Sequence, residues 1–324
     1  MRQMKRERLK LVGIIVLLIV LGVSGFLAVR IFHTPKGLPL TAEVIKSGPP
    51  HFLYALYGEG FKRPLAVTVA PDGRMFVADT GNSQIQVFSP NGKHLLSFGQ
   101  GKLNYPFALL YHDHKLYVAD PNLMKVFVFN DKGEELPSFA DKLHLPAASM
   151  SGDVVRPTAI QVGPDGNFYI ADVGNQCIIV LDGNGRVIRY FGSAGKGDGQ
   201  FQYPNGLWVN KKGDIYVADS NNGRIEIFDN QGRYLFKVDG TQGKVGPLTL
   251  PRGIAVTEDG TILVVDVFLH TVRAFDAAGN ELWVFGGMGV GNGQFNFPNG
   301  LYIDQLGRIL VTDRENNRIQ VFGY

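Results

Sequence analysis

Cysteine is almost absent from this chain of 324 residues, in which Cys177 is the single example. One thiol cannot form an intrachain disulfide, and it cannot supply the ligands of a zinc finger or zinc ribbon. No neighbouring base or helix start in the sequence would activate Cys177 as a nucleophile. We therefore expect a half-buried small residue at this position.

Catalytic side chains are sparse as well. The seven histidines are scattered along the chain, and His112 and His114 form the one close pair. Two ligands without a third seldom hold a metal. No Ser-His-Asp arrangement and no nucleophile elbow is visible. The glycine-rich stretches at 195–199 and 289–293 lack a following helix that would bind phosphate. We expect no metal, no cofactor and no catalytic residue, and we favour a function other than an enzyme.

Charge is unevenly distributed along the sequence. Residues 1–36 contain seven Lys or Arg and one Glu, which gives this segment a net charge of +6. The formal charge of the whole chain is +3, so the remainder carries −3. A mildly acidic remainder offers no broad surface for phosphates. We therefore expect no nucleic-acid partner.

The N-terminal segment has the pattern of a membrane anchor. Residues 1–10 include five basic residues, and residues 11–29 contain no charge. At about 1.5 Å per residue, these 19 residues approach the ~30 Å thickness of the bilayer core. The positive-inside rule predicts a cytoplasmic segment at 1–10, a single-pass signal anchor at 11–32 in the inner membrane, and a periplasmic remainder. A cleaved secretory signal ending near Val23-Ser24-Gly25 is the alternative.

A spacer follows the predicted anchor. Residues 33–50 contain four prolines and two glycines, a composition typical of an extended linker.

One pattern is repeated six times after the spacer. Prolines that open it stand at Pro64, Pro106, Pro157, Pro204, Pro251 and Pro298. An aspartate follows 14 or 15 residues after each proline, at Asp79, Asp120, Asp172, Asp219, Asp266 and Asp313. In the fourth copy, runs rich in β-forming residues at 206–209, 214–218, 224–228 and 234–238 are separated by turn residues. Six four-stranded units with this period predict an all-β, six-bladed β-propeller at 51–324.

The repeat resembles a known family. The pattern P-x-G-[LI]-x-V, followed by G-x-[IL]-Y-V-A-D-[ST]-x-N-x-R-I-x-[VI]-F, is clearest at 204–228 and 298–322 and is similar to the NHL repeat. The second and fifth copies match less well. The resemblance implies a propeller that usually binds a partner. Some similar propellers are lyases that hold a metal through histidines near the central cavity, but none of the residues that follow the prolines here is a histidine.

The two ends of the repeat region complement each other. The sixth copy stops at Tyr324 after its third strand, whereas residues 52–57 resemble fourth strands elsewhere. We expect this N-terminal strand to complete blade six, because closure removes the exposed edge of an open sheet.

The six aspartates allow two interpretations, a catalytic ring of carboxylates or a repeated turn. An aspartate at a strand end, followed by Asn and by an Arg five residues on, is typical of turn chemistry. We favour the turn, because positions shared by all copies serve the fold.

Binding residues are expected where the copies differ. The loops that lead into the first strands should surround the mouth of the central channel, and their side chains are aromatic, arginine or amide. The predicted ligand-binding residues are Arg63, Tyr105, Phe107, Arg156, Tyr203, Asn205, Arg252, Phe297 and Asn299. Arg63, Arg156 and Arg252 favour an acidic ligand, whereas Tyr105, Tyr203 and Phe297 would also serve to pack under a neighbouring loop.

Together these patterns predict a membrane-anchored extracytoplasmic NHL propeller that binds an envelope protein or polysaccharide. The alternative is a periplasmic lyase or hydrolase with a metal in the central cavity.

Overall fold

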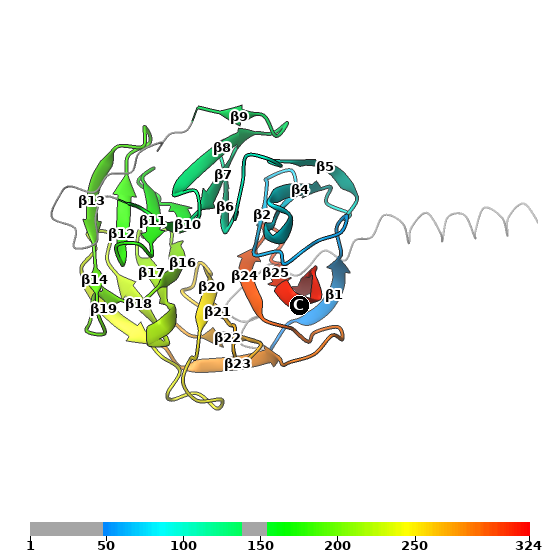
Figure 1. Ribbon diagram of the computed structural model, residues 1–324. Helices are drawn as coiled ribbons and strands as arrows, with labels where there is room; N and C mark the ends of the chain where they lie inside the picture. The colour runs from blue at the N-terminus through cyan, green and yellow to red at the C-terminus, as the bar shows by residue number, and fades with distance from the viewer. Residues whose placement is uncertain (1–47, 138–153) are drawn as a thin grey trace, which may run out of the picture. The chain divides into compact units, whose positions relative to one another are not determined.

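The structure is a computed structural model that describes residues 48–137 and 154–324. These residues form six four-stranded antiparallel sheets that are arranged as the blades of a propeller (Figure 1). The predicted all-β, six-bladed fold is therefore confirmed. Within the described residues, no helix is both long enough and apolar enough to span a bilayer. The predicted cytoplasmic segment 1–10 and signal anchor 11–32 lie outside these residues, as does most of the predicted linker.

Blades one to five take their strands in chain order, from the first strand at the channel to the fourth at the rim, whereas the fourth strand of blade six is the N-terminal strand. The strands are β2 (Ala66–Val69), β3 (Met75–Asp79), β4 (Gln84–Phe88) and β5 (His94–Phe98) in blade one; β6 (Ala108–His112), β7 (Lys115–Asp120), β8 (Lys125–Asn130) and β9 (Glu135–Leu136) in blade two; β10 (Pro157–Val162), β11 (Phe168–Asp172), β12 (Cys177–Leu181) and β13 (Val187–Phe191) in blade three; β16 (Pro204–Val209), β17 (Ile215–Asp219), β18 (Arg224–Phe228) and β19 (Tyr234–Val238) in blade four; β20 (Pro251–Val256), β21 (Ile262–Asp266), β22 (Thr271–Phe275) and β23 (Glu281–Gly286) in blade five; β24 (Pro298–Ile303), β25 (Ile309–Asp313), β26 (Arg318–Gly323) and β1 (His51–Leu56) in blade six.

Short elements join some of the strands. One-turn 3-10 helices η1 (Thr80–Asn82), η2 (Ser220–Asn222) and η3 (Arg314–Asn316) follow the second strands of blades one, four and six. The two-residue strands β14 (Ser193–Ala194) and β15 (Gln200–Phe201) pair in the glycine-rich connection between blades three and four. This connection runs from blade to blade, as predicted.

The ring closes through its N-terminal strand. Strand β1 pairs antiparallel with β26, with Phe52 opposite Phe322 and Leu56 opposite Ile319. A bulge at Leu53 shifts the register within the pair. The expected closure is confirmed, with the strand at 51–56 where the sequence predicted 52–57. Blade six therefore has four strands, like the other blades.

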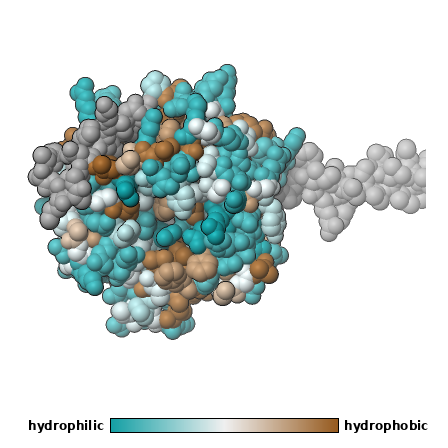
Figure 2. Space-filling view, viewed as in Figure 1, coloured by the Kyte–Doolittle hydropathy of each residue, from teal (hydrophilic) through white to brown (hydrophobic). Residues whose placement is uncertain are grey.

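The core lies between the blades. Each large cluster of buried apolar side chains is shared by two neighbours, as where Tyr169 and Ile178 of blade three pack against Val217 and Phe228 of blade four. Because each sheet has two apolar faces, it needs a neighbour on both sides. On the face seen in Figure 2, polar residues cover much of the surface and apolar residues form patches between them. Cys177 is buried in this core, where burial raises the pKa of its thiol.

The six repeated aspartates are fully buried. In every blade the carboxylate accepts a hydrogen bond from a backbone N–H of the loop that leads into the same blade's first strand. The donors are Lys62, Asn104, Arg156, Gln202, Thr249 and Asn296, at 2.6–2.8 Å. The predicted structural role of these aspartates is confirmed, since each carboxylate fixes a loop.

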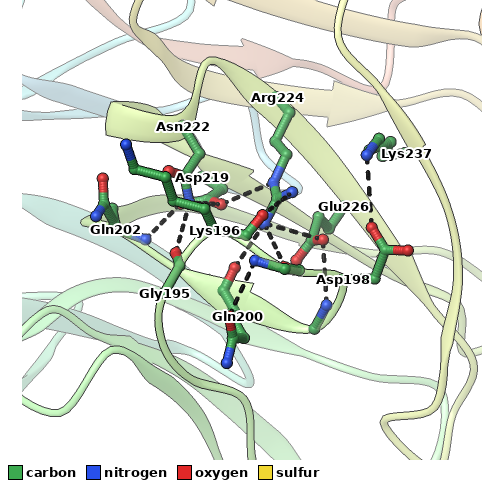
Figure 3. Close-up of polar contacts among 12 residues, drawn as sticks. Gly195, Lys196, Asp198, Gln200, Gln202, Asp219, Asn222, Arg224, Glu226 and Lys237 are labelled. Carbon is green, nitrogen blue, oxygen red and sulfur yellow. Dashed lines mark hydrogen bonds and ion pairs between the residues drawn. The ribbon is translucent and has the colours of Figure 1, made fainter.

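Blade four extends this arrangement with a buried arginine (Figure 3). Arg224 donates from Nε to Asp219, at 3.0 Å. Its terminal nitrogens donate to the carbonyl oxygens of Lys196, Gly197 and Gln200. One guanidinium thus joins the aspartate to the glycine-rich connection from blade three. Blade six repeats the arrangement, with Arg318 bonded to Asp313 at 2.7 Å.

Glu226 stands where blades one and six have a glutamine. Gln320 of blade six accepts from the Gly293 N–H and donates both to Asp313 and to the Gln294 carbonyl. Glu226 accepts from the Gly199 N–H in the same way, but its second oxygen has no hydrogen-bond partner. A protonated carboxyl can donate as the glutamine does. Burial raises the pKa of Glu226 to about 7, and the Asp219 and Asp198 charges add to the effect against the opposing Arg224.

We predict that Glu226 makes the stability of the propeller depend on pH. The folded chain binds this proton more tightly than the unfolded chain, so the stabilisation is full below pH 4.5 and is lost as the pH rises through about 7. The loss amounts to about 3 kcal/mol, because one pKa unit corresponds to about 1.4 kcal/mol. Glu226→Gln should therefore raise the Tm at pH 8 and change it little at pH 5, as measured by circular dichroism.

The reciprocal substitution in blade six serves as the control. Gln320→Glu places the same carboxyl in blade six, and it should lower the Tm at pH 8 more than at pH 5. Parallel curves of Tm against pH for the parent and both variants would contradict the assignment.

Candidate functional site

The central channel is lined by the first strands of all six blades. The residue that follows each repeat proline lies in this lining, as predicted; they are Leu65, Phe107, Thr158, Asn205, Arg252 and Asn299. The channel has a volume of about 80 Å³, which holds a few water molecules. Pockets for small ligands usually measure about 300–1,000 Å³. A ligand would therefore bind across the mouth of the channel and not inside it.

Polar side chains at the mouth connect neighbouring blades. The hydroxyl groups of Thr80, Thr158 and Ser220 donate to the proline carbonyl that begins the next blade, at 2.6–2.9 Å. Asn299 likewise donates to the Leu65 carbonyl at 3.0 Å, from blade six to blade one. These bonds join neighbouring blades at four of the six joints around the channel.

The two amides predicted to bind a ligand take part in this ring. Asn299 is buried, and besides its bond to Leu65 it accepts a hydrogen bond from Arg252 at 2.8 Å. Asn205 is half-buried and donates to the Ser220 hydroxyl at 2.9 Å. Sequence reasoning missed this use of the amides, since the bonds of Asn299 cross to the two neighbouring blades and Asn205 bonds a residue beyond the second strand of its own blade.

The three predicted arginines differ in their surroundings. The side chain of Arg63 is 63% exposed and pairs with Glu315 of blade six at 3.2 Å. Arg156 is exposed. Arg252 is half-buried in the channel, where its Nε has no hydrogen-bond partner. Burial and the neighbouring Arg314 lower the pKa of Arg252.

Among the described residues that line the channel, Arg252 is the single one with a charged side chain. Among the residues that the structure describes, no carboxylate forms an ion pair with it. A half-buried cation without a counter-ion attracts an anion more strongly than an exposed one does, because less water screens it. An arginine in these surroundings can form paired hydrogen bonds with a carboxylate.

The aromatic side chains near the prolines divide into open and packed groups. Tyr203 is 53% exposed and Tyr105 is 37% exposed. Tyr105 lies beside Phe107, with ring centroids 6.1 Å apart. Phe297 instead packs against His270, at 4.7 Å between centroids, and beneath the Arg314 guanidinium. Tyr203 thus offers an open ring, whereas Phe297 packs under its neighbours.

Three residues that precede the prolines have strained backbones. Arg63, Tyr203 and Phe297 have φ values of 51°, 58° and 49°, in the left-handed region that favours glycine. The N–H of each is held by a side chain of the preceding blade: Asn317, Gln176 and His270, respectively, at 2.6–3.0 Å. Such strain persists where the surroundings over-determine it, and it is frequent at ligand-binding surfaces.

The family model of the NHL repeat matches residues 61–88, 201–228 and 295–322. Three of the six copies are therefore matched by the NHL model. The matched segments extend from the loop before the first strand to the end of the third strand in blades one, four and six. These are also the blades in which the residue before the proline has a positive φ.

Solved structures share the fold at low sequence identity. A streptogramin B lyase superposes with a TM-score of 0.60 and 13% identity, over 83% of this chain and 96% of that chain. A catalytically inactive virginiamycin B lyase from Staphylococcus aureus, with quinupristin, has a TM-score of 0.58 and 16% identity, over 83% of this chain and 87% of that chain. A selenomethionine-substituted virginiamycin B lyase from Staphylococcus aureus has a TM-score of 0.54 and 14% identity, over 84% of this chain and 87% of that chain. A comparison with curated proteins gave no match.

Metal ligands do not gather in the described part of the chain. No group of three or more His, Cys, Asp or Glu side chains is placed there to hold an ion. His114 lies near Asp131, at 3.5 Å, and is strongly exposed. The residues predicted to bind a ligand around the channel mouth include arginines and aromatic residues, which are not metal ligands of this kind.

We predict that the strain at Tyr203 can be relieved by glycine. A left-handed conformation costs an L-residue about 1–2 kcal/mol and costs glycine nothing. Tyr203→Gly should therefore leave the free energy of unfolding at least about 1 kcal/mol higher than Tyr105→Gly, because Tyr105 has no positive φ. Denaturant unfolding of the two variants measures the difference. Equal stabilities would show that the left-handed backbone at Tyr203 carries no strain.

Proposed function

We propose that the propeller is a binding module for a carboxylate-bearing polymer, an acidic protein segment or a polysaccharide of the cell envelope. The observation that carries the proposal is the uncompensated charge of Arg252 at the mouth of the channel. The guanidinium suits a carboxylate because its nitrogens match the spacing of the two oxygens. Its bond to Asn299 holds it in position.

Neighbouring side chains extend the surface around Arg252. Arg63 and Arg156 are exposed and lie on the loops that precede the first strands of blades one and three. Their charges would bind further carboxylates along a polymer. Tyr203 presents an exposed ring that can stack on a sugar or pack on an apolar side chain. Recurrent carboxylates spaced by apolar or sugar surface therefore fit this face better than a single small anion.

A ligand in the cell envelope requires the propeller to lie outside the cytoplasm. The basic segment at 1–10 and the uncharged stretch at 11–29 favour a propeller tethered there. We predict that alkaline phosphatase fused after Tyr324 is active and stays with the membrane fraction. Inactive phosphatase would contradict the orientation, and active phosphatase in the soluble fraction would contradict the retained anchor.

The mouth arginines provide the test of binding. A variant with Arg63, Arg156 and Arg252 changed to Ala should elute from immobilised polygalacturonate or polyglutamate at lower salt than the parent. We expect a loss of affinity of at least about tenfold, the effect of ~1.4 kcal/mol. Two columns separate a preference for uronic acids from a preference for acidic peptides.

A variant of equal charge controls for non-specific attraction. Lys93, Arg186 and Arg233 are exposed and precede the fourth strands of blades one, three and four, at the opposite end of the propeller. Changing these three to Ala should leave elution unchanged. If both triple variants elute alike, the mouth is not the binding surface.

A lyase or hydrolase with a metal in the central cavity is the second candidate. It is favoured by the likeness to streptogramin B lyase and virginiamycin B lyase. At 13–16% identity, this likeness shows a shared fold and no shared activity. Metal analysis of the purified full-length protein separates the candidates. A stoichiometric metal that is lost together with a catalytic activity would support the enzyme and count against the binding module.

A further inference from the structure

A second and larger cavity opens at the other end of the propeller. The first strands begin at the mouth and end at the turns that lead to the second strands, and three of these turns, in blades four, five and six, border the cavity. Its volume is about 860 Å³, within the usual range of small-ligand sites. Trp208, Phe236, Val256 and Ile303 contribute apolar side chains to its wall.

The corresponding space between blades one and two is filled. There Tyr111 stacks on Phe76 at 5.2 Å between centroids, and its hydroxyl donates to Asp131 at 2.7 Å. Arg74 reaches across from blade one and donates to the same Asp131 at 2.8 Å. Two side chains of blade two and one of blade one thus close the gap between the sheets.

Smaller residues occupy the equivalent positions between blades four and five. By strand register, Val256 corresponds to Tyr111 and Ala277 corresponds to Asp131. Asp214, one residue before β17, replaces Arg74, one residue before β3. Each change shortens a side chain, so the cavity is a consequence of sequence differences among the repeats.

The polar groups around the cavity are mostly engaged with one another. Asp214 accepts a hydrogen bond from Asn210 at 2.9 Å, and Asp259 accepts one from Thr261 at 2.9 Å. Lys211 of blade four pairs with Glu258 of blade five, and both side chains are highly exposed. A ligand would therefore find apolar walls and little unsatisfied charge.

We propose that this cavity binds a neutral, largely apolar small molecule that carries an aromatic ring. The ring would lie against Trp208 and Phe236, whose faces favour stacked or edge contacts. The exposed ion pair of Lys211 and Glu258 joins two turns at the rim and costs little to open, because surface pairs contribute at most about 1 kcal/mol. This site is independent of the anion-binding mouth.

Filling the cavity tests the proposal. Ala277 lines the cavity, whereas its neighbour Ala278 does not, and both are exposed in the same turn. The probe is N-phenyl-1-naphthylamine, a neutral two-ring compound whose fluorescence rises in apolar surroundings. In full-length protein, the parent and Ala278→Phe should show the same saturable fluorescence increase. Ala277→Phe should weaken it at least tenfold. All samples share one detergent, so binding by micelles cancels in the comparison.

A second variant covers the case in which Ala277→Phe fails to fold. Asp214→Arg combined with Ala277→Asp reproduces the pair that fills the space between blades one and two, and it should also abolish saturable binding. The proposal is overturned if the parent shows no saturable component, if a folded filled variant binds like the parent, or if Ala278→Phe loses binding as well.

Discussion

The buried carboxylate at the end of each second strand is the interaction on which the rest of the propeller depends. It sits where the chain has just crossed the blade, and it accepts the N–H of the loop that leads into the same blade, as Asp219 does from Gln202. A buried charge is costly unless hydrogen bonds satisfy it, so this bond fixes the conformation of the loop. Because all six blades carry the aspartate, the six loops before the prolines are held in equivalent positions around the channel.

A scaffold fixed in this way leaves the mouth side chains free to differ. Hydroxyl groups such as that of Ser220 join the inner strands by donating to a backbone carbonyl of the next blade. Because the acceptor is backbone, the bond does not depend on the side chains beside the proline. The residue before the proline can then be arginine, tyrosine or phenylalanine, even with a positive φ. The side chains at the mouth can thus vary among the copies, while the carboxylates and hydroxyls beneath them hold the backbone in place.

The sequence predicts those features that recur with the repeat. The strand order, the closure by Phe52 and the buried role of Asp219 all follow from the spacing of prolines, aspartates and apolar runs. Contacts between blades are a different matter. The pairing of Arg63 with Glu315 spans 252 residues of the chain, and Asn299 uses its amide to bond Leu65 across the closing joint. No local pattern encodes these contacts, because they depend on which variable positions of neighbouring copies meet in space.

The same reasoning explains why the two ends of the propeller should act separately. Asn205, at the mouth, and Trp208, at the wall of the opposite cavity, lie three residues apart on β16, so this strand joins the two sites physically. Coupling between sites requires an element with two arrangements that both ligands bias. Strand β16 pairs with β17 and contacts the first strands on either side, β10 and β20, so a shift of this strand would break contacts with three neighbouring strands. The channel is also too narrow to pass a ligand from one end to the other. An anion at Arg252 should therefore leave the affinity of the apolar cavity unchanged.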